Sequence, residues 1–216
     1  MTPNRLARCW FGVNAAVVLV GVVVQLFVTA DGDEGFFTTP WKRVLNVFCF
    51  FTIQSNILVG VTSLFLAMGW ARPTLLFRTL RLTAVVAIAL TFVVFHAVLR
   101  DLQDLTGEAA FADFLLHTAS PMLCVVGWLW FGPRRQTSRF AVWLTLVYPL
   151  VWGVFTLVRG HEIGFYPYPF IDPVDSGYDR VVVNLVIIGA VFVGLSAGAH
   201  WLDRRLAARR SSPVSA

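Results

Sequence analysis

A threonine and a histidine in apolar segments of this chain could together carry out nucleophilic acyl transfer. Thr52 lies in the segment Phe-Thr-Ile-Gln-Ser-Asn at 51–56, and His117 lies in His-Thr-Ala-Ser-Pro at 117–121. A threonine hydroxyl becomes an effective nucleophile when a base takes its proton, and neutral histidine is the usual base. The alternative is that both side chains form hydrogen bonds that hold helices together. Residue spacing alone favours this structural interpretation.

Five further polar residues in apolar segments are candidates for a substrate pocket around this pair. They are Ser55, Asn56, His96, Ser120 and Asn184. Residues three or four apart share one face of a helix, so Ser55 and Asn56 lie on the face of Thr52, and Ser120 lies on that of His117. Asn56, Ser55 or backbone N–H groups are candidates for stabilising an oxyanion. Polar side chains are costly in lipid, which makes these positions the place to look for function.

An aromatic segment rich in proline follows the fifth apolar run. Residues 159–180 contain Tyr-Pro-Tyr-Pro-Phe at 166–170 and a further proline at position 173. Proline fixes φ and lacks an N–H donor, so we predict that this segment is extended rather than helical. Its aromatic side chains suit a cap at the membrane interface, with Tyr166 and Tyr168 facing the pocket. A rigid connector is the alternative, and we interpret His161 as solvated.

The composition places these residues in a membrane. Of 216 residues, 57% are hydrophobic and 13% are charged, and the mean hydropathy is +0.73. A soluble core could not bury so much apolar surface in a chain of 24.0 kDa. A spanning helix needs about 20 mostly apolar residues, and six runs qualify. They are approximately 9–29, 44–70, 82–99, 111–131, 140–158 and 181–201. We therefore predict an all-α membrane protein, a bundle of six transmembrane helices over 1–206, with a disordered cytoplasmic tail at 207–216.

The distribution of charge between the runs predicts an orientation. Twelve of the 17 basic residues alternate onto one side: Arg5, Arg8, Arg72, Arg78, Arg81, Arg134, Arg135, Arg139, Arg204, Arg205, Arg209 and Arg210. Eleven of the 12 acidic residues fall on the other side, and Asp203 is the exception. Basic connections stay in the cytoplasm during insertion, so both termini are predicted to be cytoplasmic in a multi-pass cell-membrane protein. At 1.5 Å per residue, Thr52 lies roughly 12 Å and His117 roughly 9 Å below the outer boundary.

Several function classes are disfavoured by what the apolar runs contain. No Asp, Glu, Lys or Arg lies well inside any run, which argues against an ion-coupled transporter or proton pump. The basic residues sit at the ends of the runs rather than along one exposed face, which argues against nucleic-acid binding. Cys9, Cys49 and Cys124 have no metal-binding spacing and suit packing roles. A cleaved signal peptide ending near Ala30 is an alternative for the first run.

Four segments resemble the bacterial Pr6Pr family of integral membrane proteins. They are the segments at 51–56 and 117–121, Gly-Trp-Leu-Trp-Phe-Gly-Pro at 127–133, and Tyr-Pro-Tyr-Pro-Phe at 166–170, the last being the most specific. The similarity extends from the first run to about Trp201. That family in turn resembles the eukaryotic androgen-induced gene proteins and the androgen-dependent TFPI-regulating protein. The chain departs from the eukaryotic pattern in having one residue fewer between His117 and Pro121, and in Gly127, near which relatives often carry an acidic residue.

The resemblance implies a function as well as a fold. The eukaryotic relatives are atypical threonine hydrolases that cleave fatty-acid esters of hydroxy fatty acids. Their essential threonine and histidine correspond by motif to Thr52 and His117. The resemblance thus implies a lipid-ester hydrolase that acts on a lipid-like ester in the outer leaflet, among membrane lipids and without a metal or organic cofactor. The alternative is a non-enzymatic protein that binds a lipid or small molecule, or scaffolds partners, through the same pocket.

Overall fold

The computed structural model describes residues 4–32, 35–71, 73–102 and 104–211, and these residues form helices and no strand. Six helical stretches are long and apolar enough to cross a membrane, as the sequence predicts. They are Arg5–Asp31, Phe51–Met68, Leu75–Leu102, Gly107–Phe131, Arg139–Ile163 and Tyr178–Arg209. Arg72, Asp33, Glu34 and the last five residues of the predicted tail, 212–216, lie outside the described part of the chain.

Several spans are built from more than one helical segment. The α-helices are α1 (Arg5–Asp31), α2 (Pro40–Val47), α3 (Phe51–Met68), α4 (Leu75–Val94), α5 (Gly107–Phe114), α6 (Ser120–Phe131), α7 (Arg139–Thr145), α8 (Val147–Ile163), α9 (Pro173–Ser176) and α10 (Tyr178–Ser211). Two π-helical turns, η1 (Phe95–Leu99) and η3 (Leu115–Ala119), extend α4 and join α5 to α6. Two 3₁₀ turns, η2 (Arg100–Leu102) and η4 (Pro169–Ile171), complete the set.

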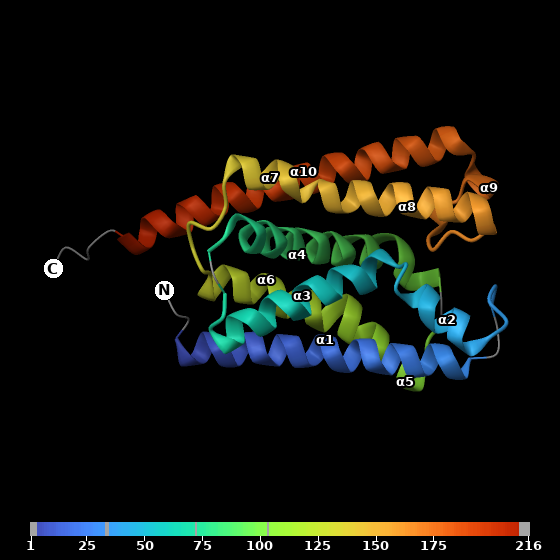
Figure 1. The fold of residues 1–216 in the computed structure, drawn as a ribbon, viewed down its shortest axis with the longest axis horizontal. Coiled ribbons are helices and arrows are strands. Elements are labelled where there is room, and N and C mark those ends of the chain that lie inside the picture. Colours follow the sequence, from blue (N-terminus) through green and yellow to red (C-terminus); the bar gives the residue numbers. More distant parts are fainter. Residues whose placement is uncertain (1–3, 33–34, 72, 103, 212–216) are drawn as a thin grey trace.

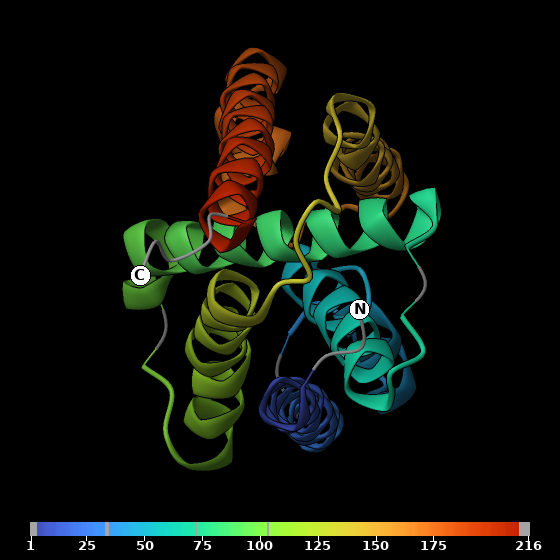
Figure 2. The same cartoon turned by 90° about the vertical axis from the view of Figure 1, so that its left-hand side faces the viewer.

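Helix α4 lies at the centre of the bundle, with helices on both sides of it (Figures 1 and 2). On one side it packs against α3 and α6, and α1 closes that side by packing on α3, α5 and α6. On the other side it contacts α7 and α10. A helix that is apolar all round is expected to be buried, and α4 has the largest buried share of the six spans.

The helix is interrupted between α2 and α3, inside the run that the sequence predicts as one helix over 44–70. Side chains donate hydrogen bonds to carbonyl groups at this interruption. Gln54 donates to the carbonyl of Phe48 (2.9 Å), and the Trp152 indole donates to that of Cys49 (2.9 Å). No proline or glycine marks this position in the sequence. Because α3 begins at Phe51, Thr52 lies in the first turn of a helix and not deep within one.

Two other predicted boundaries differ from the structure. The aromatic segment predicted as extended over 159–180 is shorter, because α8 continues to Ile163 and α10 begins at Tyr178. Within it, Pro169 and Pro173 begin the short helical turns η4 and α9, where a missing N–H costs nothing. Helix α10 also continues to Ser211, through the first part of the segment predicted as a disordered tail.

The two ends of the bundle differ in charge, and both ends of the described chain lie at the same one (Figure 1). We name this the arginine-rich end; its described members are Arg5, Arg8, Arg78, Arg81, Arg134, Arg135, Arg139, Arg204, Arg205 and Arg209. Arg8 donates to the Ala67 carbonyl at the end of α3 (2.7 Å), which places these helix ends together. The opposite end, the acidic end, carries Asp31, Asp101, Asp104, Glu108, Asp113, Glu162, Asp172, Asp175 and Asp179.

Two charged residues that lie just outside the predicted apolar runs are buried, because the helices are longer than those runs. Arg81 on α4 is 5% exposed and donates to the Thr62 hydroxyl (3.3 Å), with the Phe11 ring 5.2 Å from its guanidinium carbon. Asp203 on α10 is 1% exposed. Both lie toward the arginine-rich end, away from Thr52.

Gly127 is a position where α6 approaches α1 closely, which gives the first prediction. A Cβ atom there would lie 2.5 Å from Trp10 Nε1, and that indole is fixed by a hydrogen bond to the Leu123 carbonyl (2.9 Å). We expect Gly127→Ala to lower the free energy of unfolding by about 1–3 kcal/mol through overpacking. Apparent Tm in detergent measures this. Gly12→Ala is the matched control, since its Cβ would meet only Ala67 at 3.9 Å. A Gly127→Ala protein as stable as Gly12→Ala would contradict the prediction.

Candidate active site

His117 lies in the π-helical turn η3 between α5 and α6. Pro121 explains the turn, because its ring cannot approach the carbonyl of residue 117 and it lacks an N–H for the α-helical ladder. The Ser120 N–H bonds instead to the Leu115 carbonyl, five residues back. Such π-turns occur frequently at functional sites, since they reorient side chains relative to a regular helix. His96 lies in the second π-turn, η1.

The structure gives His117 an orienting partner that the sequence analysis missed. Its Nδ1 lies 2.8 Å from Asp113 Oδ1 and 3.2 Å from the Asp113 carbonyl oxygen. Both are acceptors, so Nδ1 carries a proton; in the neutral imidazole the acceptor nitrogen is then Nε2, which has no hydrogen-bond partner among the described residues. The Phe95 ring stacks on the imidazole at 4.0 Å with an interplanar angle of 11°. The i, i+4 spacing of Asp113 and His117 is the signal that could have revealed this pair.

Thr52 contacts the aromatic segment through Tyr168, which lies next to the turn η4. The Thr52 N–H donates to Tyr168 Oη (3.2 Å), and the two hydroxyl oxygens lie 3.3 Å apart. The first N–H groups of a helix have no partner within it, and Phe50, the N-cap of α3, supplies no side-chain acceptor. The phenol therefore caps the N-terminus of α3, where the helix dipole favours negative charge.

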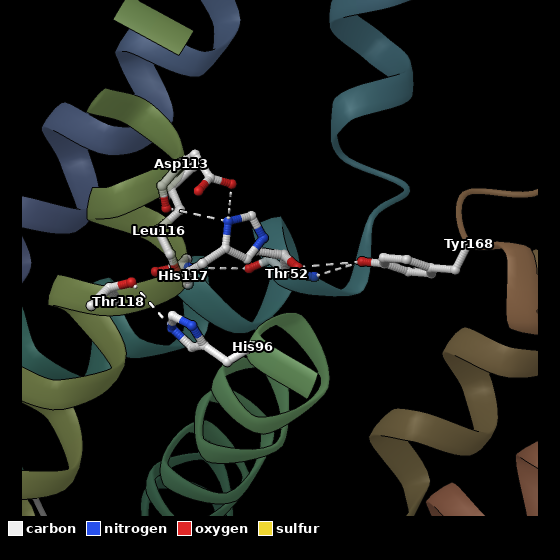
Figure 3. Close-up of polar contacts among 8 residues, drawn as sticks. Thr52, His96, Asp113, Leu116, His117, Thr118 and Tyr168 are labelled. Carbon is white, nitrogen blue, oxygen red and sulfur yellow. Dashed lines mark hydrogen bonds and ion pairs between the residues drawn. The ribbon is translucent and has the colours of Figure 1, made fainter. Parts of the chain in front are cut away.

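Thr52 and His117 are on adjacent turns of neighbouring helices, but no hydrogen bond joins them in the described structure. Asn56 connects the two turns: its Nδ2 donates to the Thr52 carbonyl (2.9 Å) and to the Leu116 carbonyl (3.0 Å). Figure 3 shows Thr52 between Tyr168 on one side and the turn that carries His117 on the other. The structure thus brings the predicted pair to one region, with the threonine hydroxyl directed to Tyr168.

Two of the predicted pocket residues make no hydrogen bond to the side chain of Thr52 or His117 in the described structure. Ser55 Oγ donates to the Thr52 carbonyl (2.9 Å) and lies 3.1 Å from the Thr91 hydroxyl on α4, so it joins two helices. Ser120 is fully buried, and its hydroxyl has no hydrogen-bond partner in the described structure. Ser55 and Asn56 both donate to main-chain carbonyls, and the Thr52 N–H donates to a side chain, the Tyr168 hydroxyl.

The remaining predicted residues make contacts between the helices and the aromatic segment around the site. His96 Nε2 lies 3.3 Å from the Thr118 hydroxyl, which links the two π-turns. Asn184 on α10 donates to the Phe170 carbonyl (2.8 Å) and so fixes the aromatic segment. The Tyr166 ring packs against Gly160 of α8, where any Cβ would collide with it. His161 is on α8 and exposed.

Thr52 is one of the residues that line an apolar cavity of about 190 Å³. Residues of α3, α4, η1, α8, α10 and the aromatic segment line it, together with Leu146 between α7 and α8, and no charged side chain is among them. Its hydroxyl groups are those of Thr52, Thr91 and Tyr168. Burial raises the pKa of the Tyr168 phenol, an effect that the hydrogen bonds from Thr52 partly oppose. The phenol is therefore neutral and can both donate and accept a hydrogen bond.

Comparison with known proteins finds no matching family model, no similar curated protein and no similar solved structure. The resemblance to the Pr6Pr family stays a prediction from the four sequence segments.

Proposed function

We propose that this protein is a membrane lipid-ester hydrolase with Thr52 as nucleophile and His117 as base. The observation that carries the proposal is the Asp113–His117 pair beside the turn of Thr52, a residue that lines an apolar cavity. A carboxylate that holds one imidazole nitrogen leaves the other as a base, which is the arrangement of a catalytic triad. The cavity suits an ester whose chain is apolar.

The first half of the reaction forms an acyl-threonine. Thr52 Oγ attacks the ester carbonyl carbon while its proton passes to His117 Nε2, for which the two atoms must come within about 3 Å. The tetrahedral intermediate then expels the alkoxide, which takes the proton from His117 and leaves as an alcohol. Asp113 holds the imidazole and stabilises its protonated form.

The second half regenerates the threonine. A water molecule gives a proton to His117 and attacks the acyl carbonyl carbon, and the returning proton goes to Thr52 Oγ as the fatty acid leaves. The Thr52 N–H and the Tyr168 hydroxyl would stabilise both oxyanions once the substrate carbonyl oxygen replaces the present contact between them. Ester and water enter, and acid and alcohol leave, so no cofactor is consumed.

The proposed location is the outer half of the cell membrane. The supporting argument is the charge of the two ends: basic connections favour the cytoplasm, so the arginine-rich end faces inward and the acidic end, with Thr52, faces outward. The acyl chain of the substrate then stays in the hydrocarbon layer while its ester reaches the site.

Labelling with a fluorophosphonate probe tests the assigned nucleophile, using the full-length protein in detergent. We expect the native protein and Thr52→Ser to be labelled and Thr52→Ala not to be labelled, because only the first two carry the hydroxyl. Thr156→Ala is the matched control, since the Thr156 hydroxyl is buried on α8 with no hydrogen-bond partner among the described residues, and its loss is expected to be tolerated.

Two outcomes would count against the hydrolase. Labelling that persists in Thr52→Ala would exclude Thr52 as the nucleophile. If neither the native protein nor Thr52→Ser is labelled or turns over an ester, the second candidate, a protein that binds a lipid without chemistry, is favoured. The contact of the Thr52 hydroxyl with Tyr168 rather than His117 is the observation in its favour.

A further inference from the structure

The cavity that Thr52 lines reaches the outer surface of the bundle. Leu150 and Val154 on α8 line it, yet each is 64% exposed. Both lie inside the span Arg139–Ile163, so in a membrane this surface contacts lipid chains rather than water. The cavity therefore opens sideways into the hydrocarbon layer.

The opening lies between α8 and α10. Helix α10 packs on α4 and α7 but makes few contacts with α8. Figure 2 shows α8 and α10 as two separate columns on the same side of α4. From α10, Leu185, Ile188 and Gly189 line the cavity opposite the α8 wall. The aromatic segment, which connects these two helices, contributes Tyr168 and Phe170 to the lining, and Tyr168 contacts Thr52 there.

Two glycines keep this passage open. A Cβ added at Gly189 would meet no atom within 4 Å, and one at Gly153 would meet only Leu185 at 3.9 Å. Glycine in a helix interior costs about 1 kcal/mol relative to alanine, and here it leaves a smooth wall on each side of the cavity. Larger residues at these positions would fill the space.

We propose that the space between α8 and α10 is an entry and binding site for one acyl chain, which reaches Thr52 sideways from the membrane. The lining has no charged group, so it offers nothing to a polar headgroup. At about 190 Å³ the cavity is smaller than the roughly 300–1,000 Å³ of sites that enclose a whole ligand. One chain segment fits while the rest of the molecule stays in lipid. This inference rests on the proposed function in one respect only, namely that the acyl chain belongs to an ester whose carbonyl reaches Thr52.

Photo-crosslinking of the full-length protein in lipid nanodiscs tests the site without requiring chemistry. The probe is a long-chain alkyl ether with a diazirine in the middle of the chain, which cannot be hydrolysed. We expect mass spectrometry to find the label on cavity-lining positions of α8 and α10, such as Leu157 and Leu185. Gly189→Phe should reduce this labelling about 10- to 100-fold, because its ring would occupy the space of the chain. One extra or missing methylene in an apolar pocket already changes affinity about 10- to 200-fold.

Gly194→Phe is the matched control, because Gly194 is also on α10 with open space at its Cβ but does not line the cavity. It should label like the native protein. Gly153→Val, from the opposite wall, replaces Gly189→Phe if that variant does not fold. Equal labelling in the native protein, Gly189→Phe and Gly153→Val, or labelling spread over all lipid-facing helices, would overturn the site.

The hydrolase and the chain site can fail separately. Cavity labelling that is lost in Gly189→Phe, in a protein whose Thr52 does not react with a fluorophosphonate, would support the chain site and remove the hydrolase. Fluorophosphonate labelling of Thr52 together with ether labelling that ignores Gly189→Phe would retain the hydrolase and remove this entry route.

Discussion

His117→Ala is expected to lower kcat for ester hydrolysis by about 10²–10⁴-fold, the usual contribution of a positioned general base. Without the imidazole, no other described group beside Thr52 can take its proton, because the neighbouring Tyr168 phenol is neutral. KM should change little, since the cavity that holds the chain is built from other residues. Turnover of a long-chain ester in detergent, measured over a range of substrate concentrations, separates the two parameters.

Asp113→Asn extends the same prediction to the orienting residue. In a serine protease the equivalent change costs roughly 10⁴-fold in kcat. Here the effect should be smaller, because the Asp113 and His117 side chains are 25% and 19% exposed and water can replace part of the contact. His161→Ala and Asp101→Asn are matched controls at exposed positions outside the site. Unchanged kcat in His117→Ala would remove this histidine from the mechanism.

Asp203→Ala is expected to reduce the free energy of unfolding by about 3–5 kcal/mol, as when one member of a buried charged network is removed. The Asp203 carboxylate accepts from the N–H groups of Gln136 (3.1 Å) and Thr137 (3.3 Å) and from the Thr137 hydroxyl (2.9 Å). It also lies 3.9 Å from Arg134 Nη1. The change leaves these donors buried, so apparent Tm should fall on the order of 10 °C.

Asp179→Ala is the matched control for this prediction, because Asp179 is on the same helix and exposed. Asp203→Asn should be intermediate, since its amide keeps one acceptor oxygen. The loss should concern stability and leave kcat unaffected, because the site lies at the other end of the bundle. An apparent Tm of Asp203→Ala within 2 °C of the Asp179→Ala value, a margin set by the smallest shift expected from 1 kcal/mol, would contradict the proposed role of this network.

The six spans were predictable because lipid imposes a simple requirement: a run of apolar residues long enough to cross it. The interruption before α3 was not predictable, since it depends on a hydrogen bond from the indole of Trp152. That residue is distant in the sequence, so no local pattern contains the contact. Hydropathy also measures apolar runs and not helices, so α10 extends beyond its run to Ser211.

Within the candidate site, the sequence indicated Thr52 and His117 through residue type and resemblance. Asp113 was counted only as a charge at the edge of an apolar run, although its spacing to His117 fits a helical pair. The contact of Tyr168 with Thr52 joins positions 116 residues apart. A contact of that kind is set by how the helices pack, which no local pattern contains.

The phenol of Tyr168 competes with any substrate for the backbone of Thr52. A carbonyl oxygen can reach the Thr52 N–H only when this hydrogen bond is broken. A neutral hydrogen bond is worth about 0.5–1.5 kcal/mol net, so the competition alone weakens apparent affinity by roughly 2- to 13-fold. This factor is the same for every carbonyl ligand, so the Tyr168 contact lowers binding at Thr52 without changing the preference between one ester and another.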